Sequence, residues 1–272
     1  MRRESRIRPF SYFIYLPVVL LLVFAGCQSD DTGTARLKVT LTDLPGDYDS
    51  VNVDILGVSV HSNENASESD GGWTQLENSN VGVVNLLEYT DGAELTLADL
   101  EYPTGRISQI RLLLGDNNTV WIDSTSFDLE TPSAMQSGLK LLVNETLIEG
   151  VTYKFTLDFD AARSVIHTGN DNYILKPVIK VITEAVSGAI SGVVNPADEN
   201  VAVFVLDGED TVATSYAPAG TADYLVGGVP AGTFSVSLDP GDSSLYDGAL
   251  IENVNVTLGN VTDAGTTDLQ LK

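Results

Sequence analysis

Apolar and polar residues alternate along much of the chain after residue 33. The clearest runs are 36–42 and 50–61, and in the second of these Val51, Val53 and Ile55 recur at every other position. Side chains of a β-strand switch sides at each residue, so a period of two indicates a strand with one buried face. The pattern therefore predicts an all-β chain in which helices are scarce.

Short runs of strand character continue to residue 159, with polar turns between them. They cover 73–76, 81–87, 106–114, 119–122, 127–130, 138–144 and 151–159. The group 115–118 (GDNN) is typical of a hairpin turn, because Gly and Asn tolerate positive φ. Segment 61–72 has almost no apolar residue, and we expect a solvated loop of variable conformation there. Many short strands with frequent turns predict a sandwich or a barrel.

Residues 157–182 (LDFDAARSVIHTGNDNYILKPVIKVI) predict a long hairpin that closes this first domain. Its first strand would place Asp158 and Asp160 together on the face opposite its apolar residues. Gly and Asn at 168–172 supply the turn, and the β-branched run 173–182 supplies the returning strand.

A change in composition near residue 187 predicts a domain boundary. From there to the C-terminus Lys272 is the only cation, against twelve acidic residues. Alternating runs follow at 188–194, 201–206, 212–216, 224–227, 232–238, 249–256 and 266–271. About seven strands in so short a segment are typical of a small sandwich. We therefore predict two tandem β-sandwich domains, a larger one at 34–186 and a smaller one at 187–272.

The first 26 residues carry a different pattern. Four Arg precede an apolar run at 12–25, which contains Pro17 and is short for a membrane-spanning helix. A basic start, a short apolar run and small residues before Cys27 are typical of a secretory signal peptide over 1–26. The segment resembles a bacterial lipoprotein signal, which implies that Cys27 is lipidated and anchors the mature chain to a membrane.

Residues 27–33 would then form an acidic tether. The stretch 28–31 (QSDD) resembles the export tag of bacterial surface lipoproteins. This resemblance implies a cell-envelope protein of the outer membrane, exposed on the cell surface, and a periplasmic location is the alternative.

The net charge of the chain argues against polyanionic partners. The whole chain has 14 Lys+Arg and 38 Asp+Glu, for a net charge of −24. Removing the predicted leader, with its four Arg and one Glu, leaves 10 basic and 37 acidic residues and a net charge of −27. A field of that sign repels phosphate backbones, so nucleic acid is not an expected partner. Cys27 is the single cysteine, which excludes an internal disulfide.

Several separated motifs in the first domain carry a family resemblance. They read TDLPGDYDSV, GGWTQL, VNLLEY, YPTGRISQIRLLL and QSGLKL, followed by the hairpin segment. Together they resemble the bacterial domain of unknown function 4382 of secreted lipoproteins, which implies a β-sandwich without an assigned activity. The residues most typical of it here are Asp43, Pro45, Leu86, Gly105, Gln109, Ile110, Arg111, Gly138, Lys140, Asp158, Asp160, Gly169, Lys176 and Pro177.

Two motifs in the second domain, AISGVV and YLVGGVPAGTFSVSL, carry a second resemblance. They are similar to the carboxypeptidase-regulatory-like domain, which has a prealbumin-like or carbohydrate-binding-like fold. The resemblance implies a spacer, a glycan-contacting module or a regulatory appendage, and it indicates fold more than function.

Two acidic groups are candidates for chemistry. Asp158 and Asp160 could act as paired catalytic carboxylates or bind a divalent cation, but nearby cations such as Lys176 favour a structural charge cluster. The other group, Asp43, Asp47 and Asp49 with Asp54, lies around a Pro-Gly turn. These carboxylates are candidate ligands for Ca²⁺, the one cofactor considered, and capping of the turn is the alternative.

Two aromatic residues are candidates for ligand contact, because each lies at a glycine-containing loop. They are Trp73, after Gly71 and Gly72, and Tyr246. With no nucleophile or phosphate-loop motif in the sequence, we expect a non-catalytic binding or adhesion module, with a glycan as candidate ligand. A structural or accessory subunit that contacts another envelope protein is the first alternative, and a carboxylate-dependent hydrolase is the second.

Overall fold

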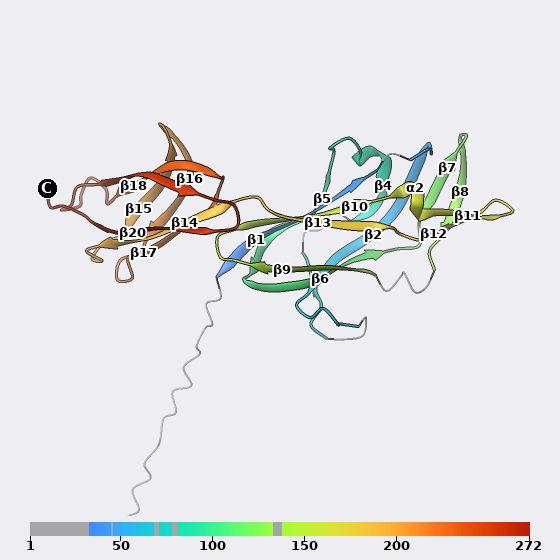
Figure 1. Cartoon of the computed structure of the whole chain (residues 1–272), viewed down its shortest axis with the longest axis horizontal. Coiled ribbons are helices and arrows are strands. Elements are labelled where there is room, and N and C mark those ends of the chain that lie inside the picture. The colour runs from blue at the N-terminus through green and yellow to red at the C-terminus, as the bar shows by residue number, and fades with distance from the viewer. Residues whose placement is uncertain (1–32, 45, 68–70, 78–80, 133–137) are drawn as a thin grey trace, which may run out of the picture. The chain divides into compact units, whose positions relative to one another are not determined.

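The computed structural model describes residues 33–44, 46–67, 71–77, 81–132 and 138–272, so the predicted leader and Cys27 lie outside the described residues. Almost all of its elements are strands (Figure 1). Those of the first sandwich are β1 (Thr34–Asp43), β2 (Ser50–His61), β3 (Thr74–Gln75), β4 (Gly82–Asn85), β5 (Leu95–Pro103), β6 (Gly105–Leu114), β7 (Thr119–Ile122), β8 (Thr125–Glu130), β9 (Leu139–Leu147), β10 (Thr152–Phe159), β11 (Val165–Gly169), β12 (Asn172–Leu175) and β13 (Ile179–Ala185). A 3-10 helix, η1 (Leu86–Tyr89), and one turn of α-helix, α2 (Ala161–Ser164), interrupt them.

The first sandwich consists of two sheets. Within the residues just given, one sheet has four strands in the order β13-β10-β1-β5. The other has nine, with the path β11-β12-β8-β7-β2-β6-β9 and with β3 and β4 paired to β2. Most of the pairs are antiparallel, but β1 with β10, and β12 with β8, run parallel.

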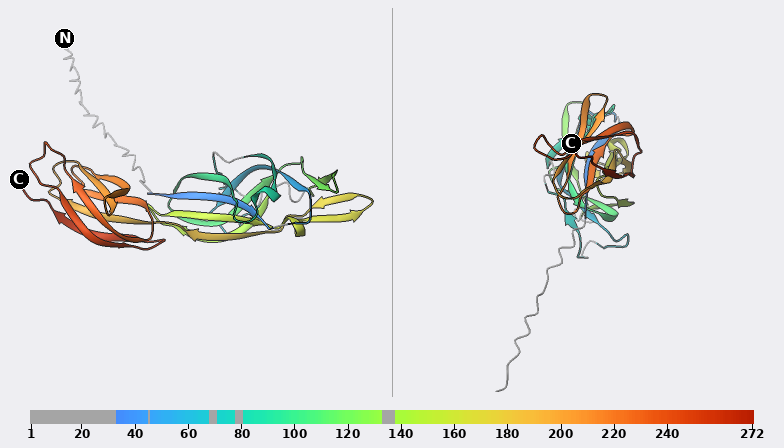
Figure 2. Two further views of the ribbon diagram at one scale, coloured as in Figure 1. Left: turned by 90° about the horizontal axis from the view of Figure 1, so that it is seen from above. Right: turned by 90° about the vertical axis from the view of Figure 1, so that its left-hand side faces the viewer.

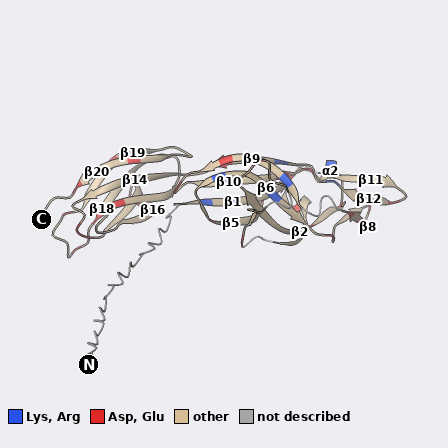
Figure 3. Cartoon of the chain, turned by 90° about the horizontal axis from the view of Figure 1, so that it is seen from below, with Lys and Arg blue, Asp and Glu red and all other residues tan. Residues whose placement is uncertain are grey.

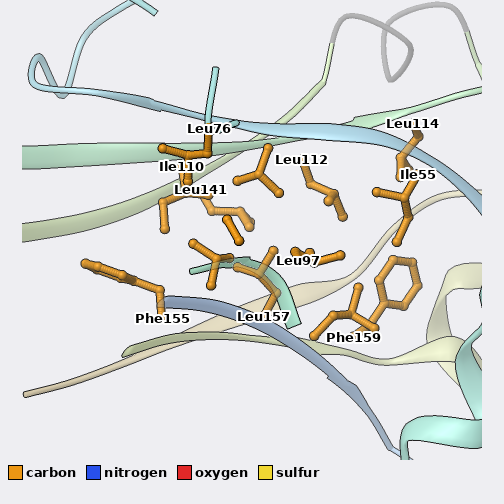
Figure 4. Close-up of a cluster of buried hydrophobic side chains, with 14 of the residues drawn as sticks. Ile55, Leu76, Leu97, Ile110, Leu112, Leu114, Leu141, Phe155, Leu157 and Phe159 are labelled. Carbon is orange, nitrogen blue, oxygen red and sulfur yellow. The ribbon is translucent and has the colours of Figure 1, made fainter. Parts of the chain in front are cut away.

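The alternation in the sequence becomes the core between these sheets. The large apolar side chains with no exposed surface on the two central strands of the four-stranded sheet are Leu37, Val39, Leu41, Phe155, Leu157 and Phe159. They join one apolar cluster with residues of the nine-stranded sheet (Figure 4), among them Ile55, Ile110, Leu112 and Leu114. Full burial of such a side chain stabilises the fold by about 1.5–3 kcal/mol, so this cluster is the main source of stability.

Strand β5 is one that the alternation did not predict. Its register against β1 shifts between Val39 and Thr40, where Leu97 is an extra residue without a partner on β1. Leu97 and Ala98 are both buried as a result, and the period of two is interrupted. A β-bulge of this kind hides a strand from a search for periodicity.

The predicted long hairpin over 157–182 is correct only in part. Strands β10 and β13 do pair antiparallel, with Leu157 opposite Val181. Between them, however, the chain leaves this sheet, forms α2, and makes the β11–β12 hairpin, which belongs to the nine-stranded sheet. Figure 2 shows this yellow hairpin extending beyond the strands of the four-stranded sheet.

Two residues cause the change of sheet. Asp160 caps α2 by accepting the N–H of Arg163 at 3.0 Å, which ends the strand at Phe159. Pro177, which has no N–H to donate to a ladder, separates β12 from β13. The turn itself lies where the sequence predicts it, between β11 and β12.

Residues 187–272, all of them described, form the second sandwich. Its strands are β14 (Gly188–Asn195), β15 (Val201–Asp207), β16 (Asp210–Ala217), β17 (Asp223–Val229), β18 (Gly232–Asp239), β19 (Ala249–Val256) and β20 (Val261–Asp268). They form sheets β17-β14-β20 and β16-β15-β18-β19 around an apolar cluster of their own. The last strand begins at Val261 rather than Thr266, because its small and polar residues give no alternation. The prediction of an all-β fold with tandem sandwiches is confirmed.

Truncation in the first core should therefore be costly. We expect Leu157→Ala to lower the free energy of unfolding by about 2–5 kcal/mol, because the deleted atoms leave a cavity between two packed sheets. The matched control is Leu142→Ala, since Leu142 is 65% exposed and its truncation should change stability by no more than about 0.5 kcal/mol. Equal midpoints in urea denaturation of the two variants would contradict this account of the core.

Candidate functional site

The outer face of the nine-stranded sheet carries a row of polar side chains. On β6, Ile110 and Leu112 point into the core, so Gln109 and Arg111 point outward. Arg111 is paired in register with Ser59 of β2 on one side and with Lys140 of β9 on the other. Three adjacent strands therefore bring these polar groups together on one surface.

Part of segment 61–73, which leads from β2 to β3, covers this surface. Gln109 is only 2% exposed, and its Nε2 donates to the carbonyls of Asn63 at 2.7 Å and Ala66 at 3.4 Å. Lys140 Nζ donates to the same Ala66 carbonyl at 3.4 Å, and Ser108 Oγ donates to that of Ser62 at 2.7 Å. Residues 62–65 and 67 are exposed, as expected of a solvated loop, whereas Ala66 is buried. Side-chain donors of β6 and β9 satisfy carbonyls of this segment and hold it against the sheet.

His61 fixes both ends of the loop. Its Nδ1 accepts the N–H of Asn63 at 2.8 Å, and its Nε2 lies 3.1 Å from the carbonyl oxygen of Gly71. An acceptor at Nδ1 and a carbonyl at Nε2 require the neutral tautomer with the proton on Nε2. His61 thus holds the loop through hydrogen bonds at both ring nitrogens and has no free nitrogen to act as a base.

Trp73 packs against this arrangement from the end of the loop. Its ring lies edge-on to that of His61, with centroids 5.1 Å apart, and its Nε1 donates to the carbonyl of Ser67 at 3.0 Å. The Arg111 guanidinium lies over the indole, with its Cζ 4.2 Å from the ring centroid. This is cation–π geometry, and the half-buried Trp73 and Arg111 form a single stacked unit.

Arg111 differs from the other described arginines in its pairing. Arg36, Arg106 and Arg163 each have a carboxylate partner within 4.0 Å. Within the described residues, no carboxylate pairs with Arg111, and its buried Nε has no hydrogen-bond acceptor. Figure 3 shows the blue Lys and Arg segments on the strands of the first sandwich, and the register makes Arg111 and Lys140 direct neighbours among them.

Tyr246, the other aromatic candidate, is held by its own domain. Its hydroxyl donates to Asp198 Oδ2 at 2.9 Å, and its backbone N–H donates to Ser244 Oγ. The hydrogen bond to Asp198 raises the pKa of the Tyr246 phenol above its ordinary value. Its ring also packs against the second apolar cluster, so its position indicates a structural role more than a free binding surface.

The candidate calcium ligands are not brought together. Asp43 Oδ1 accepts the N–H of Ala161 at 2.9 Å, Asp49 Oδ2 accepts that of Ser124, and Asp54 Oδ2 accepts from Asn117. Asp47 is exposed. In the part of the chain that the structure describes, no set of three or more His, Cys, Asp or Glu side chains is placed to hold a metal ion. Turn and loop capping accounts for the three paired carboxylates.

The proposed charge cluster of Asp158, Asp160 and Lys176 forms only in part. Asp158 lies on β10 opposite Lys180, but Asp160 is the cap of α2, so the two aspartates do not share one strand face. Asp160 forms a long ion pair with Arg163, at 3.7 Å. Within the described residues neither Asp158 nor Lys176 takes part in an ion pair, because α2 separates the segments that a continuous hairpin would have aligned.

Two hollows lie elsewhere on the described surface. One, of about 600 Å³, is lined in part by Arg36, Lys38 and Asp99, where Arg36 lowers the pKa of the Asp99 carboxyl by hydrogen bonding to it. The other, of about 400 Å³, is lined by the β7–β8 region with Asp116 and Glu130. Both are polar and open to solvent, and neither contains the Trp73 and Arg111 unit.

Comparison with known protein families finds a match for the first sandwich. The model of the family described as "Domain of unknown function (DUF4382)" matches residues 34–177, which is more than half of the chain. The chain belongs to the DUF4382 family. The resemblance read from the motifs of the first domain is confirmed, and no curated protein matches the chain.

Solved structures show only loose likeness to this DUF4382 protein. The Bacillus anthracis TIE protein is 13% identical with a TM-score of 0.24, over 88% of this chain and 34% of that one. A leucine-rich repeat protein from Bacteroides thetaiotaomicron is 12% identical with a TM-score of 0.23, over 88% and 26%. The C-terminal fragment of the pilus adhesin SpaC from Lactobacillus rhamnosus GG is 8% identical with a TM-score of 0.22, over 87% and 97%. The chain spans about a third or less of the first two, and these TM-scores support no functional argument.

Several residues typical of the DUF4382 motifs turn out to surround one feature. Gln109, Arg111, Gly138 and Lys140 all lie at the loop-covered face. Sequence reasoning assigned no role to these four residues, although Gln109 and Arg111 at alternate positions of an otherwise apolar strand were a detectable signal. Among the described residues, no helix has the length and apolar character needed to cross a membrane.

A second buried feature of the DUF4382 domain lies where β1 meets α2. Asp43 is 3% exposed, and its Oδ2 has no hydrogen-bond partner. Burial, helped by the nearby charges of Asp160 and Asp158, raises the pKa of Asp43 to about 6 against the opposing effect of the Ala161 and Leu44 N–H groups. The carboxyl is therefore a pH-sensitive part of the fold.

Asp43→Asn should remove this sensitivity. The unfolded chain has the ordinary Asp pKa of about 3.9, so the folded chain binds the proton more tightly. Protonation of Asp43 thus stabilises the fold below about pH 4, and that stability, about 2–3 kcal/mol, is lost as the pH rises through about 6.

We expect thermal midpoints measured from pH 4 to 8 to fall less steeply in Asp43→Asn than in the parent chain. Asn retains the oxygen that accepts the Ala161 N–H and does not ionise. Asp47→Asn, which removes the same charge from an exposed position, is the control and should keep the parent slope. An unchanged slope in Asp43→Asn would rule out the buried carboxyl as its origin.

Proposed function

We propose that this chain is a lipid-anchored envelope protein that acts outside the cytoplasm as a non-catalytic binding module. The anchor is the acyl-modified Cys27, exposed after removal of residues 1–26, and the tether is 27–33. The DUF4382 domain supplies the ligand-contacting surface, and a glycan is the ligand class that we favour. The outer leaflet of the outer membrane is the location that fits the acidic tether.

The observation that carries the binding role is the Trp73 and Arg111 unit on the loop-covered face. An aromatic ring at the end of the loop is stacked on a cation of β6, both are half-exposed, and the loop beside them is held by Gln109 and His61. Rigid aromatic and arginine side chains lose little entropy on binding and are enriched where proteins recognise ligands.

The arrangement of the acidic residues supports a role other than catalysis. Asp160 is engaged as a helix cap, and Asp43 accepts a backbone N–H from within the core. These carboxylates therefore stabilise local structure around α2, where a hydrolase would need them free to contact a substrate.

For the second sandwich we propose a prealbumin-like module that acts as a spacer or a second glycan-contacting surface. Its seven strands in two sheets, and the turn that begins β18 at Gly232, agree with the motifs that resemble this fold. Its surface is strongly acidic, with Lys272 as the single cation of residues 187–272. Such a charge keeps a tethered module soluble and disfavours contact with anionic surfaces.

The anchor can be tested directly in a diderm bacterium that expresses the full chain. We expect incorporation of an alkyne-labelled fatty acid and sedimentation with the outer membrane, since two or more acyl chains give stable anchoring. Cys27→Ser should abolish the label and the sedimentation. Cys27 is the only cysteine, so the label reports on acylation of this one residue. A soluble, unlabelled parent chain would refute the anchor.

The binding role can be tested with the full-length chain in mild detergent on immobilised polysaccharides. We expect retention on at least one of them, and at least about tenfold weaker binding for Trp73→Ala, because an aromatic platform is lost. Trp121→Ala is the control, since Trp121 is the other tryptophan of the chain, lies on β7 outside the Trp73 and Arg111 unit, and is 40% exposed. Failure to bind any polysaccharide, or equal retention of both variants, would count against the proposal.

A further inference from the structure

We propose that Trp73, Arg111 and Lys140, together called the Arg111 site, recognise a carboxylate group of the ligand. The class of ligand is a sugar acid, such as a uronic acid, whose single carboxylate is attached to an otherwise neutral ring. The inference deepens the proposed binding role, and the choice of a sugar as carrier of the carboxylate rests on it.

The first argument is the direct pairing of two cations. Arg111 of β6 and Lys140 of β9 are opposite each other in the antiparallel register, so they project from the same face. Side chains so placed have Cβ atoms about 4.5–5.5 Å apart, and like charges there repel each other. An anion placed between the two cations is attracted by both, and this attraction offsets their mutual repulsion.

The second argument is the unused hydrogen-bonding capacity of these cations. A guanidinium has five N–H donors, yet the described residues provide Arg111 with no carboxylate, and its Nε has no acceptor at all. Lys140 donates to one carbonyl at 3.4 Å, a long contact for a charged donor. By contrast, Arg36 contacts Asp99 through two nitrogens, at 2.7 and 3.2 Å. Among the described residues, carboxylates thus pair with the other three arginines and not with Arg111. Because its Nε is buried, the terminal nitrogens of this half-buried side chain are the donors that a ligand carboxylate would meet.

The third argument is preorganisation of the guanidinium. Trp73 holds one face of it by stacking at 4.2 Å. Gly138 leaves room for the side chain, since a Cβ at this position would lie 2.5 Å from Arg111 Cγ, and its φ of +102° also favours glycine. A side chain confined in this way loses little freedom when a ligand binds, so binding costs less.

The net charge of the whole chain favours a ligand with one carboxylate over a polyanion. A net charge of −24 repels a polyanion, because many charges of such a ligand come within the roughly 8 Å over which physiological salt leaves surface charges unscreened. A ligand with one carboxylate, or with widely spaced ones, meets the local pair of cations and little of that repulsion. The planar fork of Arg111 matches a carboxylate in two-point geometry, and the adjoining indole offers an apolar surface to a sugar ring.

The test titrates glucuronic acid into the full-length chain that carries Trp121→Phe, so that Trp73 is the only tryptophan. We expect saturable quenching of its fluorescence, and weaker binding of the acid at 0.5 M salt. The methyl ester of the acid and glucose have the same ring without the charge, and they should bind at least about tenfold more weakly.

Variants locate the site. In the same background, Arg111→Met should weaken glucuronic acid binding about 10- to 100-fold, Lys140→Met less, and Arg111→Lys by an intermediate factor because the fork is lost. Arg163→Met is the matched control, since Arg163 is a highly exposed arginine on α2, and it should bind as the parent does. Circular dichroism and thermal midpoints within a few degrees of the parent would show that the variants are folded.

Each remaining outcome decides the proposal. The Arg111 site is overturned if Arg111→Met binds glucuronic acid as the parent does, or if the parent does not bind it at all. In either case the wider binding role survives if the chain still binds neutral polysaccharides. Acetate or an acidic peptide bound at Arg111 as tightly as the sugar acid overturns the sugar ligand. Loss of polysaccharide binding with sugar-acid binding intact supports the Arg111 site while refuting the broader proposed function.

Discussion

The parallel pairing of β1 with β10 is the contact on which the first sandwich depends. The two strands are about 110 residues apart in the chain, and they form the centre of the four-stranded sheet with eight residues in continuous register, from Arg36 opposite Thr152 to Asp43 opposite Phe159. Their inward side chains form one wall of the core. Because loop closure over such a distance is entropically costly, the pairing persists only through the apolar surface that it buries against the other sheet.

The same pairing explains why the chain changes sheets after Phe159. At its far end β1 places the Asp43 carboxyl beneath the first turn of α2, where it accepts the Ala161 N–H, and Asp160 caps that turn from the other side. The chain is thereby directed away from the four-stranded sheet and into β11 and β12 before β13 returns. The Asp43 carboxyl thus acts with the Asp160 cap and with Pro177, which separates β12 from β13, and Asp158 and Asp160 do not share one strand face as a result.

The loop-covered face depends on the core in a similar way. Strand β6 is anchored by Ile110 and Leu112 on its inner side, and this anchoring sets the direction of Gln109 and Arg111 on its outer side. Because the inner side of β6 is packed in the core, the side chains on its outer side are held in fixed directions. Gln109, His61 and Trp73 contact the loop and hold it against this face. Polar side chains on the back of a packed strand keep their positions at little cost in entropy, which side chains of a free loop cannot do.

The sequence by itself determined the fold class, most strand positions in both sandwiches, the turn between β11 and β12 and the family, because these follow from local alternation, turn residues and motifs. It also identified Trp73 as a candidate for ligand contact. Only the tertiary structure revealed β5, which a bulge at Leu97 hides from periodicity, and the parallel partner of β1. Only the structure could also bring Trp73, Arg111 and Lys140 together from a loop and two strands. Their contacts join residues far apart in the chain, and register, bulges and burial decide such contacts, whereas local residue patterns do not.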